Sequence, residues 1–563
     1  MNLFHADPAL AELLQVYLSA DMQALALPQL ECMGALAGKR LEELALSADK
    51  NPPVLHLRAR NGADDERIEK HPAYVALEQV AFGDFGLAAM SHRAGVFGSS
   101  DKLPPQVKYA LIYLFVQAEF GLCCPLSMTD SLTRTLVKFG ASDLIDRYFD
   151  QLTSQDMDTL FQGAMFMTEQ LAGSDVGAIG TTARPVNGEW KLYGDKWFCS
   201  NPDAALAMVL ARPEGAAPGT KGLSLFLLPR HLPDGRKNAY RILRLKEKMG
   251  TRSMASGEIA LEGATAYLVG DAGQGFKQMT DMINMSRLAN GVRSAGLMRR
   301  AVYEAMFISR NRTAFGRRLS DMPLMQRQLM KMLVTAEQGR SMVFHTARVL
   351  QAADGGDAAM AKVLRILTPL VKFRTCRDAR KVAGDAMEVR GGCGYIEEWS
   401  DARVLRDAHL GSIWEGTSNI VALDVARATR REDALSALDG YIARLNAETA
   451  AVLSPQTEIF DSFRRAADLL DGVAHDRNRE PEVRQAASAV YNATSACVMA
   501  WESARLTKVT NGRADDRLQL AQAVLRHKLR PRDPLAGSDP SDIGGLALID
   551  RAMGNGRLSE AAE

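Results

Sequence analysis

The stretch Ser412-Ile413-Trp414-Glu415-Gly416-Thr417-Ser418-Asn419-Ile420 places one carboxylate between an aromatic residue and a glycine, directly before a new helical pattern. The glycine lets a ligand approach the backbone closely, and Trp414 offers an apolar wall that excludes water from Glu415. Exclusion of water raises the pKa of a carboxyl group towards neutral, as a general base requires. The alternative is a plain helix start, capped by the hydroxyls of Thr417 and Ser418. This stretch by itself leaves both interpretations open.

Two earlier segments change that balance. One is Met167–Val176, Met-Thr-Glu-Gln-Leu-Ala-Gly-Ser-Asp-Val, and the other, Lys196-Trp197-Phe198-Cys199-Ser200-Asn201, follows about one β-hairpin later. In order and spacing, these segments and Trp414–Thr417 resemble the flavin-binding and catalytic-glutamate motifs of the acyl-CoA dehydrogenase family. The resemblance covers approximately residues 70–430. Further phrases are similar to the AidB-like, or adaptive-response, branch: Lys50–Pro53, Phe226–Arg230, Leu232–Gly235 and Ser412–Gly416.

Hydrophobic periodicity divides the chain into regions of different texture. Apolar residues recur at helical spacing over residues 1–158 and again over 277–435, whereas residues 159–276 contain short alternating runs and an Asn187-Gly188 hairpin signal. We therefore predict a mainly α protein with a central β domain. The resembling family has this fold: an N-terminal helical domain, a middle β-barrel or sandwich and a C-terminal four-helix bundle, which here carries Glu415. Residues 436–563 add a helical C-terminal extension.

Composition limits the possible functions. The 563 residues are 47% hydrophobic and 24% charged, with a net charge of +1, so nothing draws the chain as a whole to nucleic acid or anionic lipid. The nine histidines and seven cysteines lack metal-ligand spacing, so we expect no metal site and reduced thiols. No secretory signal or membrane-length apolar stretch is visible. These features predict a cytoplasmic protein.

Flavin chemistry requires a face for the ring, hydrogen bonds at its edge and anchors for the pyrophosphate. By resemblance, Trp197 packs on the ring, and Thr168 and Ser200 present hydroxyls to its edge. Two residues separate Trp197 from Ser200, where many relatives have one. A shift by one strand position would turn Ser200 to the opposite face. A strand-edge tryptophan with capping hydroxyls remains the alternative for each residue taken singly.

The resemblance also implies an oligomer. Arg312 matches the arginine that reaches the FAD pyrophosphate of a neighbouring subunit, and Gly391-Gly392 matches a turn against which the partner's cofactor lies. The family precedent is a homotetramer built as a dimer of dimers. A cation near a helix C-terminus is the structural alternative for Arg312. The FAD-binding residues implied in all are Met167, Thr168, Ser174, Trp197, Ser200, Arg312, Phe315, Gly391, Gly392, Thr417 and Asn419.

The implied reaction is α,β-dehydrogenation of an acyl-CoA thioester, with Glu415 as the base and flavin N5 as the hydride acceptor. The expected substrate-binding residues are Ser174, Arg287 and Gly416, although Arg287 could equally pair with a helix carboxylate. By family precedent the electrons pass to an electron-transfer flavoprotein, in fatty acid metabolism.

Three alternatives remain. AidB-like proteins are associated with DNA protection in alkylation stress. Residues 440–563, however, hold 16 Lys and Arg against 17 Asp and Glu, and only the run Arg526–Arg532 is locally basic. Oxygen could also accept the electrons, as in acyl-CoA oxidases. Finally, the extension could be a scaffold that cements the oligomer or plugs the substrate tunnel.

Overall fold

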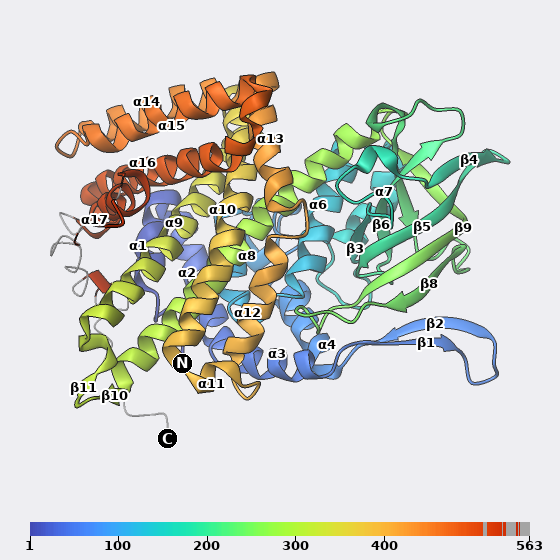
Figure 1. The fold of residues 1–563 in the computed structure, drawn as a ribbon. Helices are drawn as coiled ribbons and strands as arrows, with labels where there is room; N and C mark the ends of the chain where they lie inside the picture. The colour runs from blue at the N-terminus through green and yellow to red at the C-terminus, as the bar shows by residue number, and fades with distance from the viewer. Residues whose placement is uncertain (511–514, 532, 536, 538–547, 550, 552–563) are drawn as a thin grey trace. The chain divides into compact units, whose positions relative to one another are not determined.

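The computed structural model describes residues 1–510, 515–531, 533–535, 537, 548, 549 and 551. Its elements confirm the predicted fold class, with helices on both sides of a central β region in the chain (Figure 1). Contacts divide the chain into two compact units. The first comprises Met1–Lys39, Pro104–Gln117 and Arg287–Glu563, and the second comprises Arg40–Leu103 and Ala118–Ser286. Residues 1–158 are thus shared between the units, a division that periodicity along the chain cannot reveal.

The second unit is built on a seven-stranded sheet. The strand order is β3-β6-β4-β5-β9-β7, with β8 paired to β9 and a further β6–β7 pairing. The Asn187-Gly188 hairpin is confirmed, because Val186 faces Glu189 across the turn. A buried apolar cluster that includes Phe166, Phe226 and Ile259 forms the core. The strands are β3 (Gly163–Phe166), β4 (Thr182–Val186), β5 (Glu189–Ser200), β6 (Leu206–Pro213), β7 (Ser224–Pro229), β8 (Tyr240–Leu245) and β9 (Ser256–Val269).

Helices complete the second unit: α3 (Arg40–Lys50), α4 (Pro72–Glu78), α6 (Cys123–Phe139) and α7 (Ser142–Leu152). A hairpin of β1 (Val54–Arg58) and β2 (Asp64–Glu69) lies in the region predicted to be only helical. Charged residues dominate β2, so it lacks the apolar alternation by which strands are recognised.

The first unit is helical. Its central helices are α8 (Gly275–Asn311, shared with the second unit), α9 (Pro323–Asp354), α10 (Ala358–Arg390), α12 (Ser400–Gly411) and α13 (Ser418–Glu432). The short strands β10 (Thr313–Ala314) and β11 (Arg317–Arg318) form a hairpin between α8 and α9, and α11 (Gly392–Tyr395) follows α10. The N-terminal helices α1 (Pro8–Tyr17) and α2 (Ala20–Ala37), with α5 (Pro105–Phe115), belong to this unit.

The predicted extension contributes α14 (Ala434–Ala450), α15 (Thr457–His475), α16 (Val483–Thr510), α17 (Asp515–Val524) and a short π-helix (Leu525–Leu529). The rest of its tail lies largely outside the described residues. Glu502 on α16 is fully buried and accepts hydrogen bonds from Tyr17 at 2.7 Å and Ser341 at 2.6 Å. These bonds join the extension to α1 and α9, so it is part of the core of the first unit. No helix in the described part of the chain is long and apolar enough to cross a membrane.

Candidate active site

The loop between α12 and α13 turns sharply at Glu415. Glu415 has a φ of 56° and Gly416 a φ of 98°, so both lie in the left-handed region. This conformation costs a non-glycine residue about 1–2 kcal/mol. Strained backbone of this kind persists only where neighbouring contacts fix it, and it is concentrated at functional sites. Two buried cations supply such contacts.

The first cation is Arg287 on α8, which is 8% exposed. Its Nε donates to the carbonyl of Glu415 at 3.1 Å, and its Nη1 lies 2.7 Å from Asp424 on α13. Burial opposes the charging of Asp424, but Arg287 and Arg365 outweigh it and hold the pKa of this carboxyl below its ordinary value. The pairing of Arg287 with a helix carboxylate is therefore present. Its contact with substrate stays a prediction.

The second cation is Lys372 on α10, whose ammonium donates to the carbonyl of Gly416. Its side chain is 1% exposed. Burial lowers the pKa of Lys372 from 10.5 to about 8. No motif in the sequence pointed to this residue. A signal was available, because Lys372 interrupts the apolar run Pro369–Phe373.

The flanks of the turn are also held by arginines. The guanidinium of Arg293 lies 4.9 Å from the centre of the Trp414 ring. Thr417 occupies the N-cap position of α13, but its side chain forms no capping hydrogen bond. The expected capping by this hydroxyl is therefore wrong. Asn419, in the first turn of α13, accepts a hydrogen bond from Arg484 at 3.4 Å.

In the second unit, the fold brings the two flavin-like segments together. The N–H of Trp197 donates to the carbonyl of Thr168 at 2.8 Å. The Lys246 ammonium lies 3.4 Å from the centre of the Trp197 ring, so a flavin can contact only the opposite face or the ring edge. Met167 directly precedes this contact, and Ser174 lies in the exposed turn that follows it.

A β-bulge decides the position of Ser200. Between Lys196 and Cys199 the register of β5 against β9 shifts by one residue, so β5 accommodates an extra residue there. Lys196 and Cys199 are 1% and 0% exposed, whereas Trp197 and Ser200 are both partly exposed. The bulge therefore keeps Trp197 and Ser200 on the same face of the strand. Cys199 belongs to the apolar core and does not line this face.

A buried ion pair lies beneath the two segments. The ammonium of Lys196 is 2.7 Å from Glu169 and also donates to the carbonyls of Met167 and Leu210. Burial opposes the charging of Glu169, but Lys196 outweighs it, so the pKa of Glu169 lies below its ordinary value. The pair holds the first segment against β5. Both residues stand in the quoted motifs, yet spacing alone gave no sign that they meet.

Arg312 and the glycine turn form a separate cluster in the first unit. Arg312 donates to the backbone carbonyl that precedes Gly391, at 3.3 Å. Gly391 has a φ of 71°, and no atom within 4 Å would meet a side chain at Gly392. Phe315, on the nearby hairpin, is 96% exposed. The twelve-residue helix α12, about 18 Å long, separates the glycine turn from the Glu415 loop.

Three domain models match the chain in series. They are the adaptive response protein AidB N-terminal domain (residues 1–159), the acyl-CoA dehydrogenase middle domain (164–264) and the acyl-CoA dehydrogenase C-terminal domain (273–429). Putative acyl-CoA dehydrogenase AidB of Escherichia coli is 33% identical, over 78% of this chain and 79% of its own. The chain belongs to the acyl-CoA dehydrogenase family. Its N-terminal match confirms the AidB-like branch.

Other known proteins are similar to this chain over most of their length. Acyl-CoA dehydrogenase family member 11 of Caenorhabditis elegans is 31% identical over 80% of this chain and 74% of its own. The crystal structure of Caenorhabditis elegans ACDH-11 in complex with C11-CoA has a TM-score of 0.85 at 26% identity, over 94% of this chain and 92% of that one. The apo form of Bd2924 has a TM-score of 0.82 at 32% identity, over 89% and 98%.

This acyl-CoA dehydrogenase is FAD-dependent by family, and the residues present suit that cofactor. The hydroxyls of Thr168 and Ser200 are partly exposed, and neither forms a hydrogen bond within the described chain. Phe198 is 58% and Leu171 93% exposed, so the two segments that carry these hydroxyls also present apolar side chains at the surface. A guanidinium beside a bare glycine backbone, as at Arg312, suits a pyrophosphate.

Proposed function

We propose that the protein catalyses α,β-dehydrogenation of an acyl-CoA thioester, with Glu415 as the catalytic base. Glu415 removes the α proton of the substrate, and its backbone N–H donates to the thioester carbonyl, which stabilises the charge that develops there. Bound FAD would supply the acceptor for the β hydride, at its N5. Thr168, Trp197 and Ser200 hold and orient the flavin ring.

The left-handed turn at Glu415 is the observation that carries this proposal. A carboxylate held in strained backbone by Arg287 and Lys372 is pre-oriented, and a general base needs a fixed direction towards the proton that it removes. The adjacent Gly416 adds no side chain where a thioester would approach. A plain helix start would need neither the strain nor the two buried cations.

Anaerobic mixing of the FAD-loaded protein with a panel of short, branched, aromatic and long acyl-CoAs tests the proposal. We expect bleaching of the flavin by at least one thioester. Failure with every thioester at full flavin loading would overturn the dehydrogenase assignment. Aeration after turnover then distinguishes the possible electron acceptors. Peroxide indicates an oxidase, and its absence favours an electron-transfer flavoprotein. A cytoplasmic location and a role in fatty acid metabolism stay predictions.

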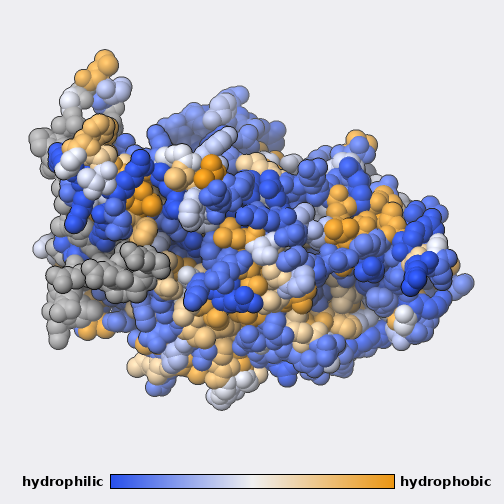
Figure 2. Space-filling model, turned by 90° about the horizontal axis from the view of Figure 1, so that it is seen from below, coloured by the Kyte–Doolittle hydropathy of each residue, from blue (hydrophilic) through white to orange (hydrophobic). Residues whose placement is uncertain are grey.

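We further propose a homo-oligomer, in which Arg312, Phe315, Gly391 and Gly392 serve the FAD of a partner subunit. Large apolar side chains are exposed on the segments that carry this cluster and on those that directly follow them in the chain. Figure 2 shows hydrophobic residues among hydrophilic ones on the face seen from below. A second copy of the chain would cover this apolar surface, and the family precedent is a tetramer. The exposed side chains are Phe315 (96%), Leu324 (81%), Tyr395 (80%), Trp399 (46%) and Ile396 (41%).

Sedimentation of charged variants tests the oligomer. Phe315→Asp and Tyr395→Asp should reduce the assembly to a smaller species and lower its FAD content. Leu535→Asp is the matched control, because Leu535 is 94% exposed but lies outside the cluster. An unchanged sedimentation coefficient in both cluster variants would contradict this assembly.

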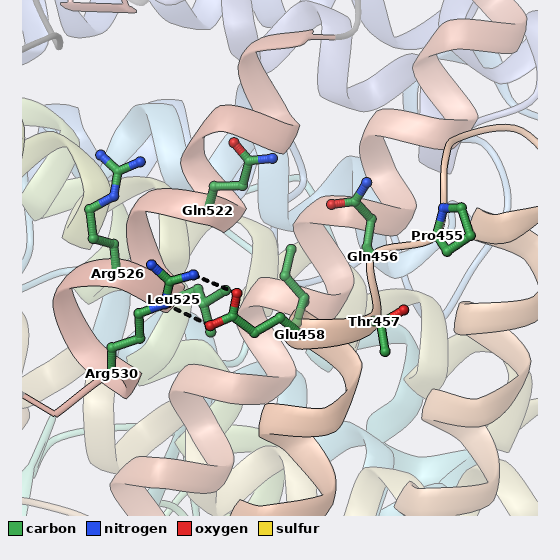
Figure 3. Close-up of a pocket in the computed structure, with 9 residues that line it drawn as sticks. Pro455, Gln456, Thr457, Glu458, Gln522, Leu525, Arg526 and Arg530 are labelled. Atoms are coloured by element: carbon green, nitrogen blue, oxygen red, sulfur yellow. Dashed lines mark hydrogen bonds and ion pairs between the residues drawn. The ribbon is translucent and has the colours of Figure 1, made fainter. Parts of the chain in front are cut away.

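The structure gives little support to the alternative of DNA binding through the run Arg526–Arg532. Arg530 donates to Glu458 at 2.6 Å, beside a cavity of about 220 Å³ (Figure 3). Lys528 donates to Thr335 at 3.2 Å, and burial lowers its pKa. Arg532 lies outside the described residues. Two cations of the run are therefore engaged within the chain, which weakens a phosphate-binding surface.

A salt titration of DNA binding provides the direct test. A phosphate-driven complex loses affinity steeply between low and moderate salt, because bound counterions are released. We expect no salt-dependent binding of duplex DNA. Tight, salt-sensitive binding that is lost in Arg526→Ala would instead favour the DNA role.

A further inference from the structure

Lys372 is a buried cation that has no role in the proposed mechanism. Its side chain is 1% exposed, and its ammonium donates to the neutral carbonyl of Gly416. In the described ranges no carboxylate lies within ion-pair distance of it, and the Glu415 carboxyl attracts the ammonium only from further away. A charge buried against a neutral group is costly, so a position of this kind calls for a reason.

Three groups face the ammonium of Lys372 from the elements around it. They are Arg287 on α8, Cys376 one turn further along α10, and Glu415 on the loop. Burial raises the pKa of the Cys376 thiol, which is therefore neutral at physiological pH. Arg287 and Lys372 donate to the consecutive carbonyls of Glu415 and Gly416.

The two cations constrain the turn in different ways. Arg287 is also tied to Asp424, so its position is fixed by α13 as well as by the loop. Lys372 approaches from α10 and binds the carbonyl that follows the strained residue. A relaxation of Glu415 towards negative φ would change the course of the chain after this residue, and would move the carbonyl of Gly416, in the following peptide, away from the ammonium. The hydrogen bond from Lys372 therefore opposes that relaxation.

We propose that Lys372 is a positioning residue that locks the Glu415–Gly416 turn in its left-handed conformation and so directs the Glu415 carboxyl towards the substrate. The inference rests on the proposed function, in which Glu415 is the base. Lys372 itself contacts neither substrate nor flavin in this role. Its charge strengthens the bond to the carbonyl, since charge-assisted hydrogen bonds are roughly twice as strong as neutral ones.

Lys372→Met tests the proposal, because methionine has a similar shape but cannot donate. In the FAD-loaded protein we expect anaerobic flavin reduction by an acyl-CoA to slow by about 10²-fold, with unchanged KM and FAD content. Lys372→Arg should recover part of the rate. Lys362→Met, on the same helix, removes only an exposed ion pair to Asp433 at 3.3 Å and should change nothing.

The pH dependence of the rate of flavin reduction distinguishes a charged hydrogen-bond donor at residue 372 from a side chain that only packs. The wild-type rate should fall as pH rises through about 8, where the Lys372 ammonium loses its proton. The rate of flavin reduction in Lys372→Met should not show this fall and should be low at every pH.

Hydrogen exchange gives a readout that does not depend on turnover. In the FAD-loaded protein, Lys372→Met should speed amide exchange in the peptide that covers residues 412–420 and leave α10 peptides unchanged. A wild-type rate in Lys372→Met, or exchange that speeds along all of α10, would overturn the inference. If the wild-type protein reduces no flavin with any thioester, the proposed function fails, while the exchange measurement still decides whether Lys372 locks the turn.

Discussion

Arg287 donates from Nε to the backbone carbonyl of Glu415 at 3.1 Å. The same guanidinium lies 2.7 Å from the carboxylate of Asp424. A residue of α8 therefore fixes both the loop that carries the candidate base and the helix that follows it. Tests of this site must consequently separate the chemistry of Glu415 from the support of the turn.

Glu415→Gln should retain FAD and lose flavin reduction. The amide keeps the shape of the side chain but cannot accept the proton, and a general base contributes about 10²–10⁴-fold to a rate. Stopped-flow bleaching with an acyl-CoA that reduces the wild-type protein measures this loss. Glu432→Gln, at the end of α13, alters an ion pair with Arg365 of α10 at 3.0 Å and is the control. Equal rates in wild type and Glu415→Gln would remove Glu415 from the mechanism.

Arg287→Met should destabilise the protein by about 1.5–3 kcal/mol, the contribution of hydrogen bonds to charged groups. The loss stays moderate because Arg365 at 2.8 Å and Arg427 at 2.9 Å still neutralise Asp424. Urea unfolding measures this change. KM for acyl-CoA tests the predicted substrate role separately, since a purely structural Arg287 would leave KM unaltered. The double variant Arg287→Met with Asp424→Asn shows how much of the loss comes from the ion pair.

Lys196→Met should lower both stability and FAD affinity. Removal of one partner from a buried ion pair costs about 3–5 kcal/mol, because the other charge is left uncompensated. Here Glu169 would remain beneath the Thr168–Trp197 contact. Flavin fluorescence during dilution measures the affinity. Lys191→Met, which removes a partly exposed lysine of the same strand paired with Glu189, should bind FAD normally.

The same ion pair predicts a pH dependence of stability. The pKa of Glu169 is lowered in the folded state from 4.5. Its contribution is therefore fully present above about pH 4.5 and is lost as pH falls through the lower, folded value. The difference in urea midpoint between wild type and Glu169→Gln should shrink on acidification through this range. A difference that stays constant from neutral pH to pH 3 would contradict the pairing.

Deletion of Phe198 should be tolerated. The bulge supplies the extra residue between Lys196 and Cys199, and its removal leaves Trp197 and the serine on one face. Phe198 is 58% exposed, so little packing is lost. Deletion of Asp195, equally on the surface but in regular pairing with β9, would invert side chains along the strand. We expect FAD binding to survive the first deletion and not the second.

The sequence alone determined the family and the fold class. Motif order and spacing identified the acyl-CoA dehydrogenase family, and hydrophobic periodicity placed helices, β domain and extension, because a burial pattern repeats along a single element. The same patterns missed the charged β1–β2 hairpin, which buries too little apolar surface to show alternation.

Only the tertiary structure decided how the individual side chains meet. The bonds from Arg287 and Lys372, which fix the left-handed φ at Glu415, join residues far apart in the chain. The same is true of the Lys196–Glu169 pair. The bulge before Ser200 depends on strand register. The physical reason is that a buried charge takes its role from the partner that neutralises or accepts it. That partner is fixed by packing in three dimensions, and spacing along the chain does not specify it.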